Sequence, residues 1–307
     1  MTHDEAVSLL SLSRQVRWDF PTSSGRPVRG EPTGDVARLV EARPRLGDAV
    51  LAFETALEPD LAAELAARCW RLWILARDVP GGRAFLAPVV DGPATRWRSL
   101  VRYGDGLLAF WQGDLAASRA RSEAALADAG ADPEALALGH LGVARAAVSD
   151  ADAAKGTEHA LAARARARDL GEPFEQAPLH MHAQARLLAQ DLDEAAVLFE
   201  ESLALNRRLQ DAGMVVCELH NLGFVQVRRG AADAAEQLFA ECERLSPAED
   251  PFARAFGELN RGAVAFVRRD PGTARLKLGA AEALLREAGL DPDGEADVRW
   301  LREKLTR

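Results

Sequence analysis

The stretch HNLGFVQVRRGAADAAEQLF, His220–Phe239, indicates the fold, because degenerate copies of it recur about forty residues before and after it. Its first small residue, Gly223, is followed by Ala235 twelve positions later and by Phe239 sixteen positions later. Small residues at such positions let two helices touch closely, and the larger apolar residue fills the next gap between them. The stretch therefore predicts two helices joined by the turn that contains Gly230.

The same pattern appears five times along the chain. The first small position is taken, at separations of 36, 41, 40 and 39 residues, by Gly106, Gly142, Ala183, Gly223 and Gly262. Twelve residues later stand Ser118, Ala154, Ala195, Ala235 and Ala274, which are also small. Gly and Asp between the paired positions suit a tight turn followed by an N-capped helix. The predicted hairpins cover 94–129, 133–170, 173–210, 213–246 and 251–288.

This spacing resembles that of the tetratricopeptide repeat, a helix–turn–helix unit that stacks into a solenoid. The predicted fold class is therefore all-α, a right-handed α-solenoid of TPR-like hairpins. Five repeats are clear, 60–92 has the same two-helix rhythm and predicts a degenerate amino-terminal hairpin, and 295–305 predicts a capping helix over the open end.

Four regions follow from this arrangement. Residues 1–34 form an amino-terminal segment whose second half, FPTSSGRPVRGEPTGD at 20–35, is rich in Pro, Gly and Ser and indicates a linker or loop. Residues 35–92 hold the amino-terminal helices and the degenerate repeat. The repeats fill 93–290, and the capping helix lies in 291–307.

Composition limits the partners and the compartment. The 38 basic and 47 acidic residues give a net charge of −9, which disfavours nucleic acid and anionic membrane as partners. Three cysteines without a C-x-x-C pair indicate reduced thiols, no apolar run is long enough for a membrane span, and the amino terminus lacks the apolar content of a signal peptide. We expect a cytoplasmic protein, and abundant Ala and Arg with few Lys indicate a bacterial source.

Two sequence segments show a closer resemblance to a known family. LAARCWRLWILARDVPGGRAFLAPVV at 65–90, together with YGDGLLAFWQGDLAASRARSEAALA at 103–127, resembles the carboxy-terminal repeat region of large bacterial ATPase regulators of the LuxR-type and antibiotic-regulator classes. The chain lacks their G-x-x-x-x-G-K-[ST] motif and an evident basic recognition helix. The resemblance implies that the chain corresponds to the sensor or interaction part of such a regulator, without its other modules. In that family this part receives a small effector or a protein.

The first helices of stacked hairpins line the concave face of a solenoid. Positions three and six before the small residue, and one and four after it, share that face by helical spacing. We expect the groove to bind its ligand through residues on or next to these positions: Tyr103, Phe110, His140, His180, Gln184, Leu187, Cys217, His220, Phe224 and Phe256.

His180 and His220 occupy equivalent positions in consecutive repeats, and Cys217 lies one turn before His220. Because adjacent first helices lie about 10 Å apart, the two imidazoles could meet across the groove. Such a cluster could hold zinc or a ligand's anionic group, and packing histidines are the simpler interpretation. We therefore predict no catalytic residues, no metal site and no cofactor.

Three functional interpretations remain open. The first is a non-enzymatic interaction or sensor protein that binds a peptide, a protein partner or a small effector in its groove. The second is an enzyme, or an enzyme's accessory subunit, with its site around His180, Cys217 and His220. The third is a homo-oligomeric structural protein that associates through its aromatic amino-terminal part, which includes Trp70 and Trp97.

Overall fold

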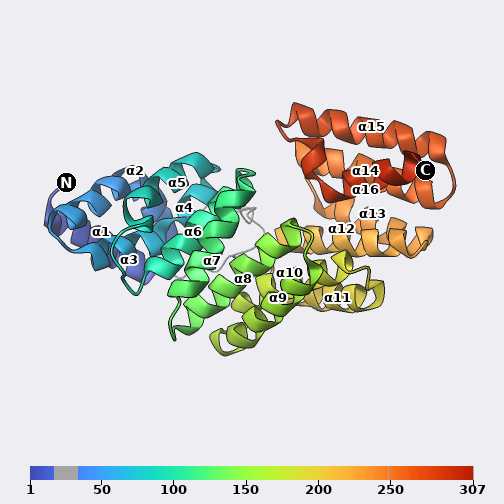
Figure 1. The fold of residues 1–307 in the computed structure, drawn as a ribbon. Coiled ribbons are helices and arrows are strands. Elements are labelled where there is room, and N and C mark those ends of the chain that lie inside the picture. The colour runs from blue at the N-terminus through green and yellow to red at the C-terminus, as the bar shows by residue number, and fades with distance from the viewer. Residues whose placement is uncertain (17–33, 248, 307) are drawn as a thin grey trace. The chain divides into compact units, whose positions relative to one another are not determined.

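The computed structural model describes residues 1–16, 34–247 and 249–306, and these form helices and turns without a β-strand (Figure 1). Most of the predicted linker at 20–35 lies outside these residues. The chain divides into two units, Met1–Ala189 and Gln190–Arg307. The predicted all-helical hairpin fold is confirmed, and each unit is described separately below.

The first unit begins with an amino-terminal helical group and continues into hairpins. Its helices are α1 His3–Gln15, α2 Gly34–Thr55, α3 Pro59–Cys69, α4 Arg71–Leu75, α5 Val79–Val90, α6 Arg98–Trp111, α7 Leu115–Asp128, α8 Pro133–Ser149, α9 Ala153–Ala167, the short 3-10 helix η1 Arg168–Leu170, and α10 Glu172–Leu188. Helices α6 and α7 pack as one hairpin, and α8 and α9 pack as the next.

The amino-terminal group is tied together by a buried carboxylate. The side chain of Glu64 in α3 is 2% exposed and accepts hydrogen bonds from Arg14 of α1 at 2.6 Å and from Arg68 at 2.9 Å. These hydrogen bonds, chiefly the one from Arg14, hold the pKa of Glu64 below its ordinary value.

In the predicted degenerate hairpin at 60–92, the first helix is interrupted at Trp70 and is therefore divided into α3 and α4.

The second unit contains α11 Leu192–Arg208, α12 Ala212–Arg228, α13 Ala232–Leu245, α14 Pro251–Val267, α15 Pro271–Glu287, the 3-10 helix η2 Pro292–Gly294, and α16 Ala296–Thr306. Helices α12 and α13 pack as one hairpin, and α14 and α15 as another. The hairpin predicted at 173–210 is divided between the units, with α10 in the first and α11 in the second.

Repeated turn chemistry starts the second helices. A residue with left-handed backbone precedes an N-capping aspartate at Gly113–Asp114, Ala151–Asp152, Gln190–Asp191 and Arg269–Asp270. Each aspartate accepts a hydrogen bond from the backbone N–H three residues later, which satisfies a donor that the helix leaves free. The predicted capping aspartate is therefore present in these four turns, whereas the left-handed residue is Gly only at Gly113, and α13 begins after Ala231 without a side-chain cap.

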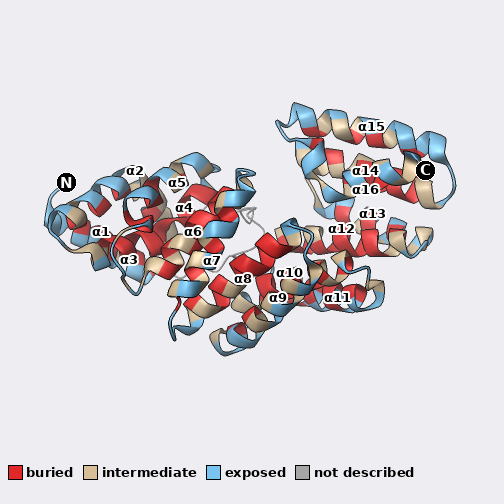
Figure 2. Ribbon diagram, in the orientation of Figure 1, coloured by how far each residue is buried: buried red, intermediate tan, exposed pale blue. Residues whose placement is uncertain are grey.

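Burial distinguishes first helices from second helices. Eleven of the 17 residues of α8 are buried, against three of the 14 in α7, and the outer sides of α7 and α15 are largely exposed (Figure 2).

The small positions of a hairpin lie close together. A Cβ atom added at Gly106 would lie 3.4 Å from the Ser118 carbonyl oxygen, and one added at Gly262 would lie 3.3 Å from the Ala274 carbonyl oxygen. The predicted contact between the two small positions is confirmed in these hairpins.

No helix within the described ranges has the length and apolar character needed to cross a membrane.

Candidate functional site

Two arginines and three aromatic rings form a cluster on the first helices of the first unit. Arg145 of α8 lies with its Cζ atom 5.8 Å from the centroid of the Tyr103 ring and 5.9 Å from that of Phe110, both in α6. Its Nη2 atom donates a long hydrogen bond of 3.4 Å to the Tyr103 hydroxyl. On the other side, the Trp70 ring meets the Tyr103 ring edge-on at 6.1 Å, and Arg71 Cζ lies 4.5 Å from the Trp70 centroid.

Among the described residues, Arg71 and Arg145 lack the anionic partners that several other arginines of this unit have. Arg83 and Arg121 both bind the Asp105 carboxylate, and Arg98 and Arg102 both bind Asp128. By contrast, Arg71 is 7% exposed and Arg145 is 4% exposed, and neither forms an ion pair with any residue of the described ranges. Burial is the main cause that lowers the pKa of Arg71, and the charge of Glu134 acts in the opposite direction.

His140 lies within its own hairpin. Its Nδ1 atom is 3.0 Å from Nδ1 of His159 in α9, so at most one of the two nitrogens carries the proton between them. Partial burial is the main cause that lowers the pKa of both imidazoles, and for His140 the neighbouring His159 adds to the effect.

Three predicted groove residues lie on α10, the last helix of the first unit. His180 and Gln184 are half-buried, and Leu187 is 7% exposed. They lie on one side of the helix by their spacing of four and three residues.

In the second unit two of the predicted groove residues, His220 and Phe224, contact the helix α16. His220 of α12 is surrounded by the rings of Phe224, Phe239 and Phe256, at centroid distances of 4.9, 6.1 and 4.8 Å. Its Nε2 atom lies 3.3 Å from Asp297 Oδ2 of α16, and Arg228 binds the other oxygen of the same carboxylate at 3.4 Å.

Trp300 of α16 adds to the contact between α16 and α12. Its ring meets Phe224 edge-on at 6.2 Å and Phe266 at 5.9 Å. Phe224 is fully buried and Phe256 is half-buried. Within the second unit, α16 therefore covers side chains of both α12 and α14.

Cys217 lies on α12, one turn from His220, and accepts a hydrogen bond from the Asn221 amide at 3.6 Å. The third member of the predicted cluster, His180, belongs to the first unit, so the cluster remains a prediction. In the described part of the chain, no three His, Cys, Asp or Glu side chains are grouped as metal ligands would be.

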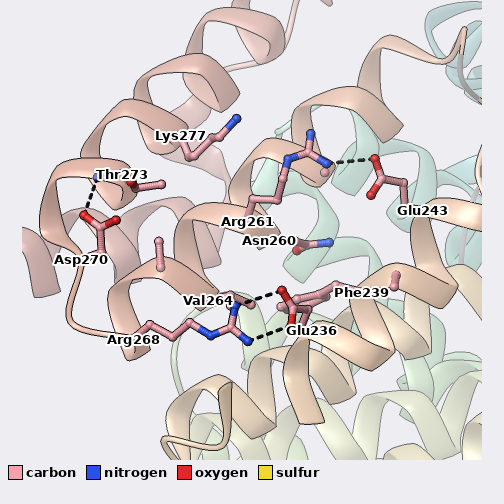
Figure 3. Close-up of a pocket in the computed structure, with 13 residues that line it drawn as sticks. Glu236, Phe239, Glu243, Asn260, Arg261, Val264, Arg268, Asp270, Thr273 and Lys277 are labelled. Atoms are coloured by element: carbon pink, nitrogen blue, oxygen red, sulfur yellow. Dashed lines mark hydrogen bonds and ion pairs between the residues drawn. The ribbon is translucent and has the colours of Figure 1, made fainter. Parts of the chain in front are cut away.

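A cavity of about 450 Å³ lies among α13, α14 and α15 (Figure 3). Ion pairs flank it, between Arg268 and Glu236 at 2.8 Å and between Arg261 and Glu243 at 2.9 Å. Between these pairs lies Asn260, which is 4% exposed and whose Oδ1 atom has no hydrogen-bond partner among the described residues. The cavity has an apolar wall that includes Phe239 and Val264.

Several of these residues were missed by sequence reasoning. Arg145 lies three positions after its small residue, Gly142, whereas the rule for the groove included only the first and fourth positions after that residue. Asp297 and Trp300 fall in a helix that was interpreted as an end cap. The unusual burial of Arg71 has no sequence signal apart from its place beside Trp70.

Comparison with known proteins identifies the fold. No protein-family model matches the chain, and no curated protein sequence matches it. Among solved structures, a Rap protein complexed with Competence and Sporulation Factor aligns with 98% of this chain and 85% of its own, at 14% identity and a TM-score of 0.65. A tetratricopeptide repeat protein from Parabacteroides merdae aligns with 88% of this chain and 98% of its own, at 12% identity and a TM-score of 0.54.

The apo form of RapI aligns with 92% of this chain and 75% of its own, at 11% identity and a TM-score of 0.51. At such low identities these likenesses establish architecture alone. The chain is thus similar to tetratricopeptide and Rap-type helical-repeat structures.

Proposed function

We propose that the chain is a helical-repeat interaction protein that binds a peptide, or a segment of a partner protein, on the first helices of its first unit. The observation that carries this proposal is the contact of Arg145 with Tyr103 and Phe110, which joins two successive first helices in one aromatic and cationic cluster, in which Phe110 is half-buried. Arginine and aromatic side chains are the residue types that dominate binding energy at protein interfaces.

The likeness in fold supports the same function. The Rap protein named above is complexed with Competence and Sporulation Factor in its structure, so a helical-repeat protein of this architecture holds a second molecule there. Transfer of a binding role to this chain rests on the surface chemistry of its own helices, because fold alone does not determine function.

We infer a regulatory role for this binding. The phrases at 65–90 and 103–127 resemble the repeat region of LuxR-type and antibiotic-regulator ATPases, in which that region is the sensor or interaction part. A partner that contacts several hairpins would change how these hairpins pack on one another, since each hairpin contacts mainly its neighbours. This role requires no catalytic residue, and we place it in the bacterial cytoplasm.

A display experiment tests the proposal. The purified chain is used to select binders from a library of random dodecapeptides, and the selected peptides are titrated against two variants. Phe110→Ser removes a half-buried ring of the proposed surface, whereas Leu161→Ser changes a residue on α9 that is 48% exposed. We expect Phe110→Ser to weaken binding at least tenfold, as the loss of an interface anchor does, and Leu161→Ser to leave it unchanged. Failure to select any peptide, or equal loss in both variants, contradicts the proposal.

A further inference from the structure

We propose that the cavity among α13, α14 and α15 binds a small uncharged molecule that carries an amide or lactam group on an apolar body. The cavity belongs to the second unit and is lined by the second helices α13 and α15 together with α14 (Figure 3). It is a different site from the one proposed for a peptide on the first unit, and the inference does not rest on that proposal.

A difference between two successive repeats accounts for the cavity. Asn221 and Asn260 stand at the same repeat position, two residues before the small residue of each repeat. In the earlier repeat, Glu218 is fully buried and accepts hydrogen bonds from the Asn221 amide at 3.3 Å and from Ser202 of α11 at 2.6 Å. The residue equivalent to Glu218 in the later repeat is Gly257, which lines the cavity. The later repeat therefore has no carboxylate at this position, and space is left beside its asparagine.

The side-chain amide of Asn260 forms no hydrogen bond within the described part of the chain. The residue is 4% exposed, and its Oδ1 atom is buried without a donor. Its amide nitrogen likewise donates to no residue of the described ranges. A side-chain amide offers one acceptor and two donors, and buried groups of this kind are in most cases hydrogen-bonded. A ligand with both a donor and an acceptor would satisfy the amide, whereas an aliphatic molecule would leave it unpaired.

An amide or lactam matches this side chain because its N–H and C=O groups lie next to each other. Its N–H would donate to Oδ1 of Asn260 while its carbonyl accepts from Nδ2, so that two hydrogen bonds form side by side. Asparagine pairs with the edge of adenine in this way, through one donor and one acceptor.

The charged side chains at the cavity are already paired, which favours an uncharged ligand. The pairs are Arg268 with Glu236 at 2.8 Å, Arg261 with Glu243 at 2.9 Å, and Lys277 with Glu258 at 2.9 Å. Another carboxylate that lines the cavity, Asp270, caps α15 by accepting from the Thr273 N–H at 3.0 Å. A charged ligand would compete with these contacts, whereas an uncharged one leaves them intact.

The apolar wall of the cavity suits the body of the ligand. Phe239 and Ala240 contribute to it from α13, and Val264 and Ala265 contribute from α14. Contact with these side chains would remove the apolar part of a ligand from water. The volume of about 450 Å³ lies within the range of about 300–1,000 Å³ that is usual for sites of small molecules.

The test is a calorimetric titration of the full chain with matched pairs of small probes. Benzamide and isoindolinone each carry an amide N–H, whereas N,N-dimethylbenzamide and N-methylisoindolinone lack it, and benzoate is the charged analogue. We expect at least one of the first two to bind, its methylated form to bind about tenfold more weakly, and benzoate not to bind. Binding of neither amide overturns the proposal, as does equal binding of the methylated form or preferential binding of benzoate.

Variants assign the binding to the cavity. Asn260→Leu keeps the size of the side chain but removes the amide, and it should weaken binding about tenfold. Gly257→Glu restores the carboxylate of the earlier repeat beside Asn260 and should abolish binding, because it occupies both the amide and the space. The urea midpoint of each variant without a probe separates loss of the amide from loss of the fold. Full binding by Asn260→Leu, or by a folded Gly257→Glu protein, contradicts the assignment.

Two controls complete the set. Leu276→Ala changes a side chain of α15 that is 72% exposed, and it should bind the probes as the unchanged protein does. Phe110→Ser, which tests the peptide site of the first unit, should also leave binding of the probes unchanged. Loss of probe binding in either control would place the ligand outside the cavity and overturn the proposal.

Discussion

The Nε2 atom of His220 in α12 lies 3.3 Å from Asp297 Oδ2 in α16, although the two residues are 77 positions apart in the chain. A helix that only closed the end of a repeat array would contact the last hairpin, α14 and α15. Through Asp297 and Trp300, α16 also reaches side chains of α12, one hairpin earlier. The last helix therefore holds two hairpins of the second unit together.

We predict that Trp300→Ala loosens this unit. The substitution removes the ring contacts with Phe224 and Phe266 and should lower the free energy of unfolding by about 2 kcal/mol, less than for a fully buried tryptophan. Hydrogen exchange followed by mass spectrometry should show faster exchange in α12, α14 and α16. Leu276→Ala, at a side chain that is 72% exposed, is the control, and equal exchange in both variants would show that α16 does not hold the hairpins.

A second prediction concerns the small position that anchors the repeat. A Cβ atom at Gly223 would lie 2.2 Å from Cε1 of Phe239, whose ring packs against Phe224 at 5.7 Å. Gly223→Ala should therefore destabilise the second unit by roughly 1–3 kcal/mol despite the better helix propensity of alanine. Gly279→Ala in α15 meets no atom within 4 Å and should stabilise by about 1 kcal/mol. Urea denaturation of both variants checks the pair, and a stable Gly223→Ala protein would refute the close packing.

The repeat could be predicted from the sequence because its signals are local. Small residues at two fixed positions mark where the helices of a hairpin touch, and Asp caps such as Asp114 and Asp270 mark where second helices begin. The break at Trp70, whose ring is buried, could not be predicted, because no Pro or Gly marks it in the sequence.

The candidate site was less predictable, because it depends on which charges find partners. In the sequence Arg145 resembles the many other arginines of the chain, and only the structure shows that Asp105 and Asp128 are occupied by other arginines. Tyr103 and Phe110 were predicted as groove residues by helical spacing alone, and that spacing places them beside Arg145. A ligand role for these residues remains a prediction.

A third prediction uses the cavity among α13, α14 and α15. The Oδ1 atom of Asn260 is buried there without a partner, a state that costs about 1–3 kcal/mol. Asn260→Leu should therefore stabilise the second unit by about 1 kcal/mol. The matched control is Asn221→Leu in α12, since the Asn221 amide donates to the fully buried Glu218 at 3.3 Å. That variant should destabilise the unit, because a buried carboxylate loses a donor. A destabilised Asn260→Leu protein would mean that the amide is bonded in solution.

The last prediction concerns acid. His140 and His159 have pKa values lowered in the folded protein, mainly by burial, so the unfolded chain binds protons more readily. Their contribution to stability is fully present above the unfolded value of about 6.5 and is lost as the pH falls through that value toward the lower folded one. Lys155 and Arg166 disfavour a positive charge on these imidazoles, whereas Glu158 favours it without reversing the direction of the pKa shift.

The urea midpoint of the first unit should therefore fall as the pH is lowered from about 7.5 to 5.5, and it should fall less steeply in a His140→Gln/His159→Gln double variant. Hydrogen exchange in α8 and α9 at the two pH values, corrected for the intrinsic rate, locates the effect. An unchanged slope in the double variant would assign the acid sensitivity to other groups.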